Sequence, residues 1–116
     1  MPEINYFHKG LAGGRWFEFP LALQLGNIGG EIQRHINAMK REDPQAAQDA
    51  FYKAIELIDL TKNDPKHRGT GRLKEICRLK EFLVDAIFND PPLYKSDLEG
   101  LVKYCNQMVI SYKSQH

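Results

Sequence analysis

The sequence has few cysteines, little net charge and no long apolar run. Of its 116 residues, two are cysteine and one is tryptophan, and the net charge is only +1. A chain of this length can bury a core without a disulfide or metal to support it. The net charge argues neither for nor against a polyanionic partner. No window approaches the roughly 20 apolar residues that a membrane-spanning helix needs, so we expect no membrane partner.

The N-terminal residues and the cysteines predict where the protein resides. Residues 1–9 are polar and lack the apolar core of a secretory signal. Cys77 and Cys105 each fall on the apolar side of a helical pattern. We interpret both as small, inert core residues, with a disulfide or reactive thiol as the alternative. The sequence therefore predicts a cytoplasmic protein in a reducing compartment.

The composition and the apolar periodicity predict one all-α domain over residues 1–116. Apolar residues make up 42% of the chain and charged residues 27%, which is typical of a globular protein. Apolar side chains recur every three or four residues in four segments separated by short connections. Short connections favour antiparallel neighbours, so we expect an up-and-down four-helix bundle. The predicted helices cover residues 20–41, 44–61, 71–88 and 97–113.

Local signals mark two of the helix starts. Asp43 followed by Pro44 is typical of an N-cap and a first helical position. Ser96 and Glu99 have the spacing of a capping box. The apolar stripe predicted to face inward from the third helix consists of Leu73, Ile76, Cys77, Leu83, Val84 and Ile87.

The segment before the first helix, residues 1–19, is predicted to be irregular but packed. Its three glycines interrupt any helical run. It is nonetheless rich in large apolar side chains, which a free tail would not usually carry. We therefore expect it to pack on one end of the bundle. Its large apolar residues are Tyr6, Phe7, Leu11, Trp16, Phe17 and Phe19.

Glycines on the first helix predict a close helix contact. Gly26, Gly29 and Gly30 each weaken the helix by about 1 kcal/mol relative to alanine. Together with Ala22 they form a smooth strip where another backbone can approach closely. One hypothesis is that this strip serves a homo-oligomer.

Basic residues are concentrated around the start of the third helix. Residues 62–80 contain seven lysines and arginines against two acidic residues, a local net charge of +5. Arg72, Lys74 and Arg78 oppose the helix macrodipole at this position. An anion held at the helix start is one explanation. The alternative is a solvated basic face, partly neutralised by neighbouring acids such as Asp59 and Glu75.

The up-and-down order brings the N-terminal segment, the loop at residues 62–71 and the C-terminus to the same end. Trp16 would there be either a stacking platform for a base or a lid over the core. Our leading hypothesis is a non-enzymatic interaction module that binds a protein, nucleic acid, phosphate or another anion. The predicted binding residues are His8, Lys9, Arg15, Trp16, Arg68, Arg72, Lys74 and Arg78.

A magnesium-dependent enzyme is the competing hypothesis. Glu56 and Asp59 have the E-x-x-D spacing of carboxylate pairs in helical nucleotide pyrophosphatases. Glu81 and Asp85 on the next helix would supply the second pair. No complete catalytic motif is present, and we predict no other cofactor.

Several short strings together resemble a family of small prokaryotic all-helical proteins of uncharacterised function. The resemblance spans about residues 8–88 and implies one compact helical domain. It also draws attention to polar residues beside the apolar stripes, which would form either a buried ionic network or a catalytic cluster. The strings are His8-Lys9-Gly10-Leu11-Ala12, Gly14-Arg15-Trp16, Asn27-Ile28-Gly29 and Arg72-Leu73-Lys74-Glu75. The polar residues are Glu31, Arg34, Glu56, Asp59, Arg78 and Asp85.

Overall fold

A computed structural model describes residues 14–89 and 97–115 of the chain. These residues form four α-helices and two short 3-10 helices, with no strand among them, so the all-α four-helix prediction is confirmed. The helix bounds lie within two residues of those predicted. The elements are η1 (Arg15–Glu18), α2 (Leu21–Lys40), α3 (Pro44–Lys62), η2 (Pro65–His67), α4 (Gly71–Phe88) and α5 (Leu98–Gln115).

The helix starts follow from local hydrogen bonds. The Asp43 side chain accepts a hydrogen bond from the backbone N–H of Ala46 at 3.1 Å, with Pro44 in the first turn, as predicted. Thr70, which the sequence did not single out, caps α4 by accepting from the N–H of Arg72 at 3.2 Å. Ser96, half of the predicted capping box, lies outside the described residues.

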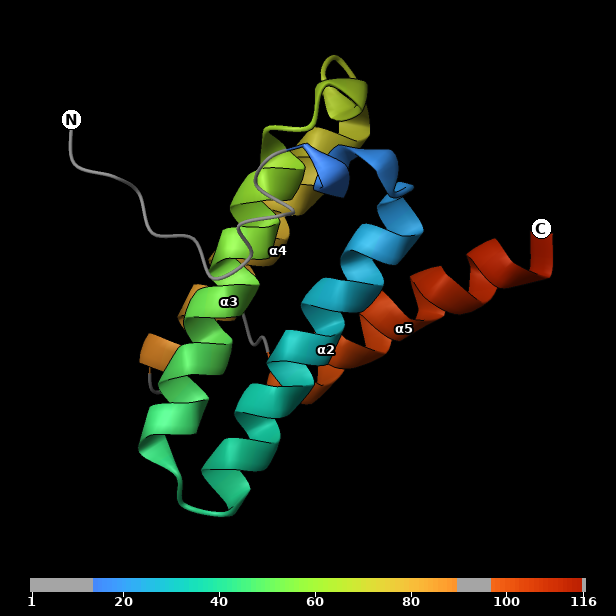
Figure 1. Cartoon of the computed structure of the whole chain (residues 1–116). Helices are drawn as coiled ribbons and strands as arrows, with labels where there is room; N and C mark the ends of the chain where they lie inside the picture. The colour runs from blue at the N-terminus through green and yellow to red at the C-terminus, as the bar shows by residue number, and fades with distance from the viewer. Residues whose placement is uncertain (1–13, 90–96, 116) are drawn as a thin grey trace, which may run out of the picture.

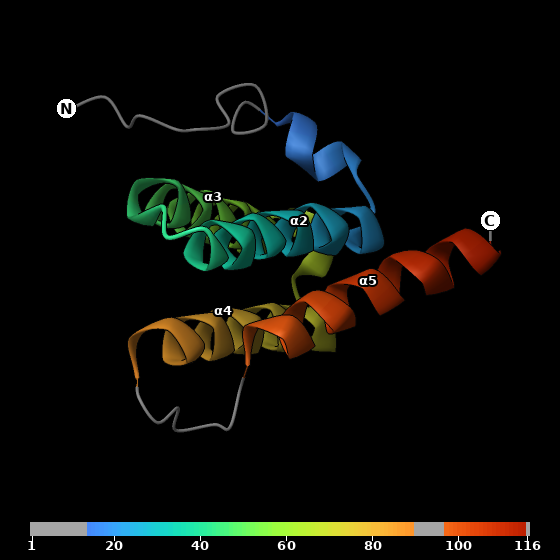
Figure 2. The same cartoon turned by 90° about the horizontal axis from the view of Figure 1, so that it is seen from below.

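The helices form two layers. α2 and α3 pack side by side in one layer, and α4 and α5 form the other (Figures 1 and 2). α5 crosses α2 but diverges from α4, and its C-terminal end projects beyond the other helices (Figure 2). The second layer is therefore more open than the first.

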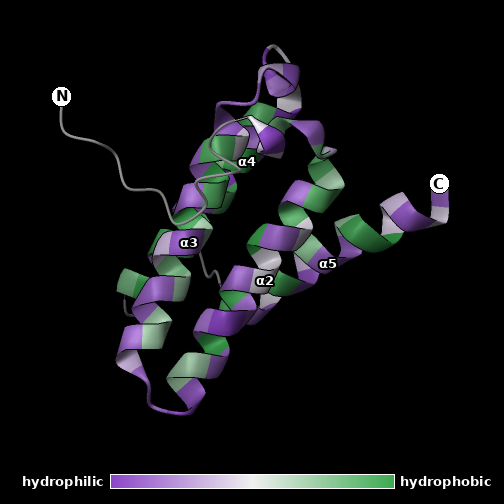
Figure 3. Cartoon of the chain, in the orientation of Figure 1, coloured by the Kyte–Doolittle hydropathy of each residue, from purple (hydrophilic) through white to green (hydrophobic). Residues whose placement is uncertain are grey.

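The core lies between the layers and draws side chains from all four helices. Each helix carries both hydrophilic and hydrophobic residues (Figure 3), as expected of helices that turn one apolar face to a core. One part of the predicted α4 stripe is wrong. Val84 is 36% exposed, whereas Leu79, which we did not place inward, is 3% exposed. The buried face of α4 is thus rotated relative to the prediction. The large aliphatic side chains that are fully buried include Ile28, Ile32, Ile58, Ile76 and Leu83.

The glycines of α2 accommodate α5 of the same chain. A Cβ atom on Gly29 would lie 2.7 Å from Cys105 Cβ, and one on Gly26 would lie 2.6 Å from Val109 Cγ2. The predicted close approach is therefore present. The proposal that these glycines meet a second copy is corrected, because α5 covers Gly26 and Gly29. Gly30 faces open space.

Both cysteines are thiols, and the described helices are not of the membrane-spanning kind. Cys77 and Cys105 are free thiols. Cys105 is fully buried, and burial raises the pKa of its thiol to about 12, so it remains a neutral core residue. Across the described ranges, no helix combines the length and apolarity needed to cross a bilayer.

Candidate functional site: a basic, apolar groove

Trp16 lies in the core at the end of the bundle. Its side chain is fully buried, and its indole Nε1–H donates to Thr61 Oγ1 at 2.9 Å. The Thr61 hydroxyl in turn donates to the carbonyl of Leu57 at 2.7 Å. The stacking role is therefore corrected, because no face of the ring is open to a ligand. The alternative interpretation, a lid over the core, describes the geometry.

A set of buried polar side chains next to Trp16 fixes its position through hydrogen bonds. Gln24 is fully buried, and its Nε2 donates to the carbonyl of Trp16 at 3.1 Å and to Asp64 Oδ2 at 2.8 Å. Its Oε1 lies 2.9 Å from His67 Nε2. We call Trp16, Gln24, Thr61, Asp64 and His67 the buried polar cluster. Because its members bond to one another, the cluster is a structural support rather than an open site.

A lysine at the surface also bonds to the buried polar cluster. Lys66 Nζ donates to the carbonyl of Phe17 at 2.9 Å and pairs with Asp64 Oδ2. Burial alone would raise the pKa of Asp64, but hydrogen bonds from Lys66 and Gln24 outweigh it and hold this pKa below its ordinary value. Asp64 is therefore an ionised link between the N-terminal turn and the loop before α4.

The predicted basic residues remain exposed around the start of α4. Arg68, Arg72, Lys74 and Arg78 are all exposed, and none forms an ion pair with the described residues. The nearby acid Asp59 pairs instead with Lys80 at 2.8 Å.

The predicted residues of the N-terminal segment divide into two groups. Arg15 is exposed on η1. His8 and Lys9 lie outside the described residues.

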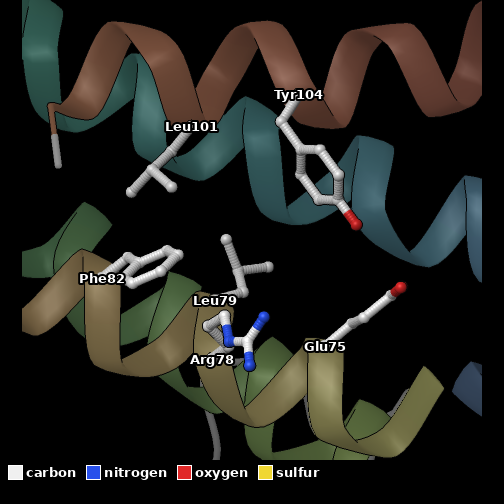
Figure 4. A pocket seen from close by; sticks show the side chains of 6 residues that line it. All are labelled: Glu75, Arg78, Leu79, Phe82, Leu101 and Tyr104. Atoms are coloured by element: carbon white, nitrogen blue, oxygen red, sulfur yellow. The ribbon is translucent and has the colours of Figure 1, made fainter. Parts of the chain in front are cut away.

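Between α4 and α5 lies a groove of about 350 Å³ (Figure 4). Leu79 and Phe82 of α4 face Leu101 and Tyr104 of α5 across it, and Glu75 and Arg78 stand at its edge (Figure 4). We call these six residues the α4–α5 groove. The sequence could not reveal it, because it results from the divergence of α5 from α4.

A narrow void adjoins the groove near the start of α4. This void has no room for a water molecule. It shares Glu75, Leu79 and Tyr104 with the groove and is also lined by Arg72 and by side chains of α2. Arg78 therefore borders the groove itself, and Arg72 lines the adjoining void about 1.7 helical turns away along α4. Partial burial and the nearby Glu75 carboxylate raise the pKa of Tyr104, so its hydroxyl is a neutral hydrogen-bond donor at neutral pH.

The four carboxylates of the enzyme hypothesis do not come together. Glu56 is half-buried on α3, and Asp59 pairs with Lys80. Asp85 is buried and accepts from the Asn89 amide at 2.7 Å, and Glu81 is exposed. Within residues 14–89 and 97–115, no group of three or more His, Cys, Asp or Glu side chains could hold a metal ion. The arrangement gives the magnesium hypothesis no support.

Among the polar residues singled out beside the apolar stripes, Asp59 of α3 forms an ion pair between helices, with Lys80 of α4. Glu31 is buried but pairs with Arg34 on its own helix. One carboxylate oxygen of Glu31, Oε2, is buried without a hydrogen-bond partner. This pair therefore does not fix the register of α2 against a neighbour.

The fold and the groove together define an all-α, four-helix protein with an open, basic-edged apolar groove. No protein-family model matches the chain, and no curated protein or solved structure is significantly similar to it. The resemblance to small prokaryotic helical proteins therefore stays a prediction from the sequence.

Proposed function

We propose that this protein is a non-enzymatic interaction module that binds an acidic, amphipathic helix of a partner protein in the α4–α5 groove. The observation that carries the proposal is an apolar groove bordered by Arg78, with Arg72 less than two turns away on the same helix. Both arginines are exposed and form no ion pair in the described structure. A surface of this kind leaves both apolar area and positive charge unsatisfied.

The floor of the groove favours a helix as the partner. Phe82 and Tyr104 supply the accessible apolar surface between the two diverging helices, above the buried Leu79 and Leu101. An amphipathic helix fills such a groove with side chains spaced three or four residues apart. Nucleic acid fits less well, because a phosphate backbone would leave the apolar floor uncovered, and Trp16 is not available for stacking.

The charges around the groove favour acidic flanks on that helix. Arg72, Lys74 and Arg78 outnumber the single acid Glu75 on this part of α4. Carboxylates beside the apolar stripe of the partner would pair with the arginines, whose planar guanidinium matches a carboxylate. Electrostatic attraction of this kind chiefly raises the association rate and the specificity.

A designed peptide tests the proposal. The probe is a labelled amphipathic helix of about 20 residues, with leucines on one face and glutamates on the others. We expect saturable binding by fluorescence anisotropy, weakened by added salt. Tyr104→Ala should weaken binding about tenfold or more, because aromatic groove residues contribute strongly to interfaces. Arg72→Gln and Arg78→Gln should each weaken it roughly two- to fivefold.

The controls separate groove binding from general charge attraction. Arg41→Gln removes the same charge at the opposite end of the bundle, where the side chain is exposed, and should leave the affinity unchanged. A scrambled peptide of equal charge should bind much more weakly. Equal binding of both peptides, or tighter binding of a single-stranded oligonucleotide that is insensitive to Tyr104→Ala, would contradict the proposal.

A further inference from the structure

The imidazole of His67 is sealed inside the buried polar cluster. Its side chain is fully buried, and Nε2 lies 2.9 Å from Gln24 Oε1. Since an amide oxygen can only accept, Nε2 carries the hydrogen in this bond. The other ring nitrogen, Nδ1, is buried without any hydrogen-bond partner. The ring is therefore neutral, with an unused acceptor that has no access to water.

Three charged groups act on this ring. Burial lowers the pKa of His67, the Asp64 carboxylate raises it, and Lys66 and Arg72 lower it further, with a net result below the ordinary 6.5. Asp64 Oδ2 lies 3.8 Å from Nε2, but it is already bonded to Gln24 and Lys66. The balance disfavours a proton on the ring.

Other ionisable groups stand on the elements around the ring, beginning with Arg68, which follows His67 in the chain and is exposed. η1 carries Arg15 and Glu18, which are exposed, and the end of α3 carries Lys62, which is partly exposed. α2 has no ionisable side chain before Glu31. Besides Arg72, the first turns of α4 carry Lys74 and Glu75, both exposed. No other buried acid in the described structure is therefore placed to balance a charge on His67.

We infer that η1, whose Trp16 forms the lid over the core, is a pH-sensitive plug that leaves the end of the bundle when a proton binds His67. The proton would bind Nδ1, and the new N–H would then have no hydrogen-bond acceptor. The positively charged ring would also be repelled by Arg72 and Lys66. Moving the ring to water would remove the donor to Gln24 Oε1. The hydrogen bond from Gln24 to the Trp16 carbonyl would then lose its support, and the indole would leave Thr61.

The pH window follows from the direction of the shift. The plugged state binds the proton more weakly than the released state, in which the ring is solvated with a pKa near its ordinary 6.5. Acidification below 6.5 therefore favours release, by up to tenfold per pH unit, until the lower pKa of the plugged state is reached. Asp64 stays ionised above its own lowered pKa, so it does not titrate between pH 7.5 and 4.5.

Trp16 reports on the plug because it is the only tryptophan in the chain. Its emission should move to longer wavelength as the pH falls from 7.5 to 4.5, because the buried indole becomes solvated. Helix content by circular dichroism should change little over the same range. If emission does not shift, or if helix content falls in step with it, the plug is not a local pH-sensitive device.

Matched variants locate the titrating group. His67→Gln keeps a donor toward Gln24 Oε1 but cannot titrate, so the emission shift should be lost. His35→Gln removes the other buried histidine of the described residues, which contacts the Ala47 carbonyl where α2 packs on α3, and the shift should persist. The inference is overturned if His67→Gln retains the shift or His35→Gln abolishes it.

A third variant tests the inference even if the His67→Gln protein does not fold. Thr61→Val removes the acceptor of the Trp16 indole N–H while leaving His67 in place. Release should then become easier, and the midpoint of the emission change should move to higher pH. An unchanged or lower midpoint would show that Trp16 release and His67 protonation are not coupled.

Discussion

Trp16→Ala is expected to lower the free energy of unfolding by about 3–5 kcal/mol. The indole is fully buried and contacts the core at the end of the bundle, and removal of a buried tryptophan leaves a cavity that the backbone only partly fills. The change also leaves the Thr61 hydroxyl without the N–H that it accepts, which adds about 1 kcal/mol to the loss. Chemical denaturation followed by circular dichroism measures the effect.

Two comparisons test the origin of this loss. Trp16→Phe keeps most of the apolar volume and removes the N–H, so it should be less destabilising than Trp16→Ala. Tyr52→Ala removes an aromatic side chain that is 48% exposed on α3, and should cost much less than the change at Trp16. A loss below about 1 kcal/mol for Trp16→Ala would mean that the end of the bundle does not depend on the lid.

Gly29→Ala is expected to be less stable than Gly30→Ala by roughly 1–3 kcal/mol. Both substitutions gain the same helix propensity, about 1 kcal/mol, because both positions lie inside α2. They differ in surroundings, since the new methyl at Gly29 would lie 2.7 Å from Cys105 Cβ and the one at Gly30 meets nothing within 4 Å. The difference therefore isolates the cost of overpacking the contact with α5.

The stabilities of Gly29→Ala and Gly30→Ala are compared from the midpoints of denaturant unfolding, provided that the two unfolding curves have the same m-value. Gly30→Ala should be more stable than the parent protein, and Gly29→Ala less stable or unchanged. Val109→Ala in the background of Gly26→Ala provides a further check, because it shortens the side chain that a Cβ on Gly26 would meet. Equal stability of Gly29→Ala and Gly30→Ala would show that α5 does not pack tightly against α2 at Gly29.

The helices could be predicted from the sequence because their signals are local. Asp43 and Pro44 start α3 through a side-chain hydrogen bond that spans three residues. The glycines of α2 likewise predicted a close helix approach, because they lack the Cβ atoms that keep backbones apart. Such features depend on residues within a turn or two of one another. The sequence did not identify the helix that approaches.

The buried face of α4 shows where local periodicity stops being informative. Leu79 and Val84 both fit an apolar stripe with steps of three and four. The structure buries Leu79 and exposes Val84, because α5 covers only part of the face that it shares with α4. Which edge of a stripe is buried depends on where the neighbouring helix lies.

The buried polar cluster was not predicted for a related reason. In the sequence, Gln24 and His67 resemble polar residues of any helix or loop. Their burial depends on contacts across 40 and 43 residues, from Gln24 to Asp64 and from His67 to Gln24. The choice between a lid and a platform for Trp16 likewise rested on Thr61, which lies 45 residues away.

The sequence by itself determined the helices, their ends, the glycine contact surface and the excess of positive charge around the start of α4. The tertiary structure alone decided that Trp16 is inside, that α5 of the same chain occupies the glycine strip, and that a groove opens beside Arg72 and Arg78. The physical reason is the range of the interactions. Capping and periodicity act within one helix, whereas burial and groove shape depend on side chains that only folding brings together.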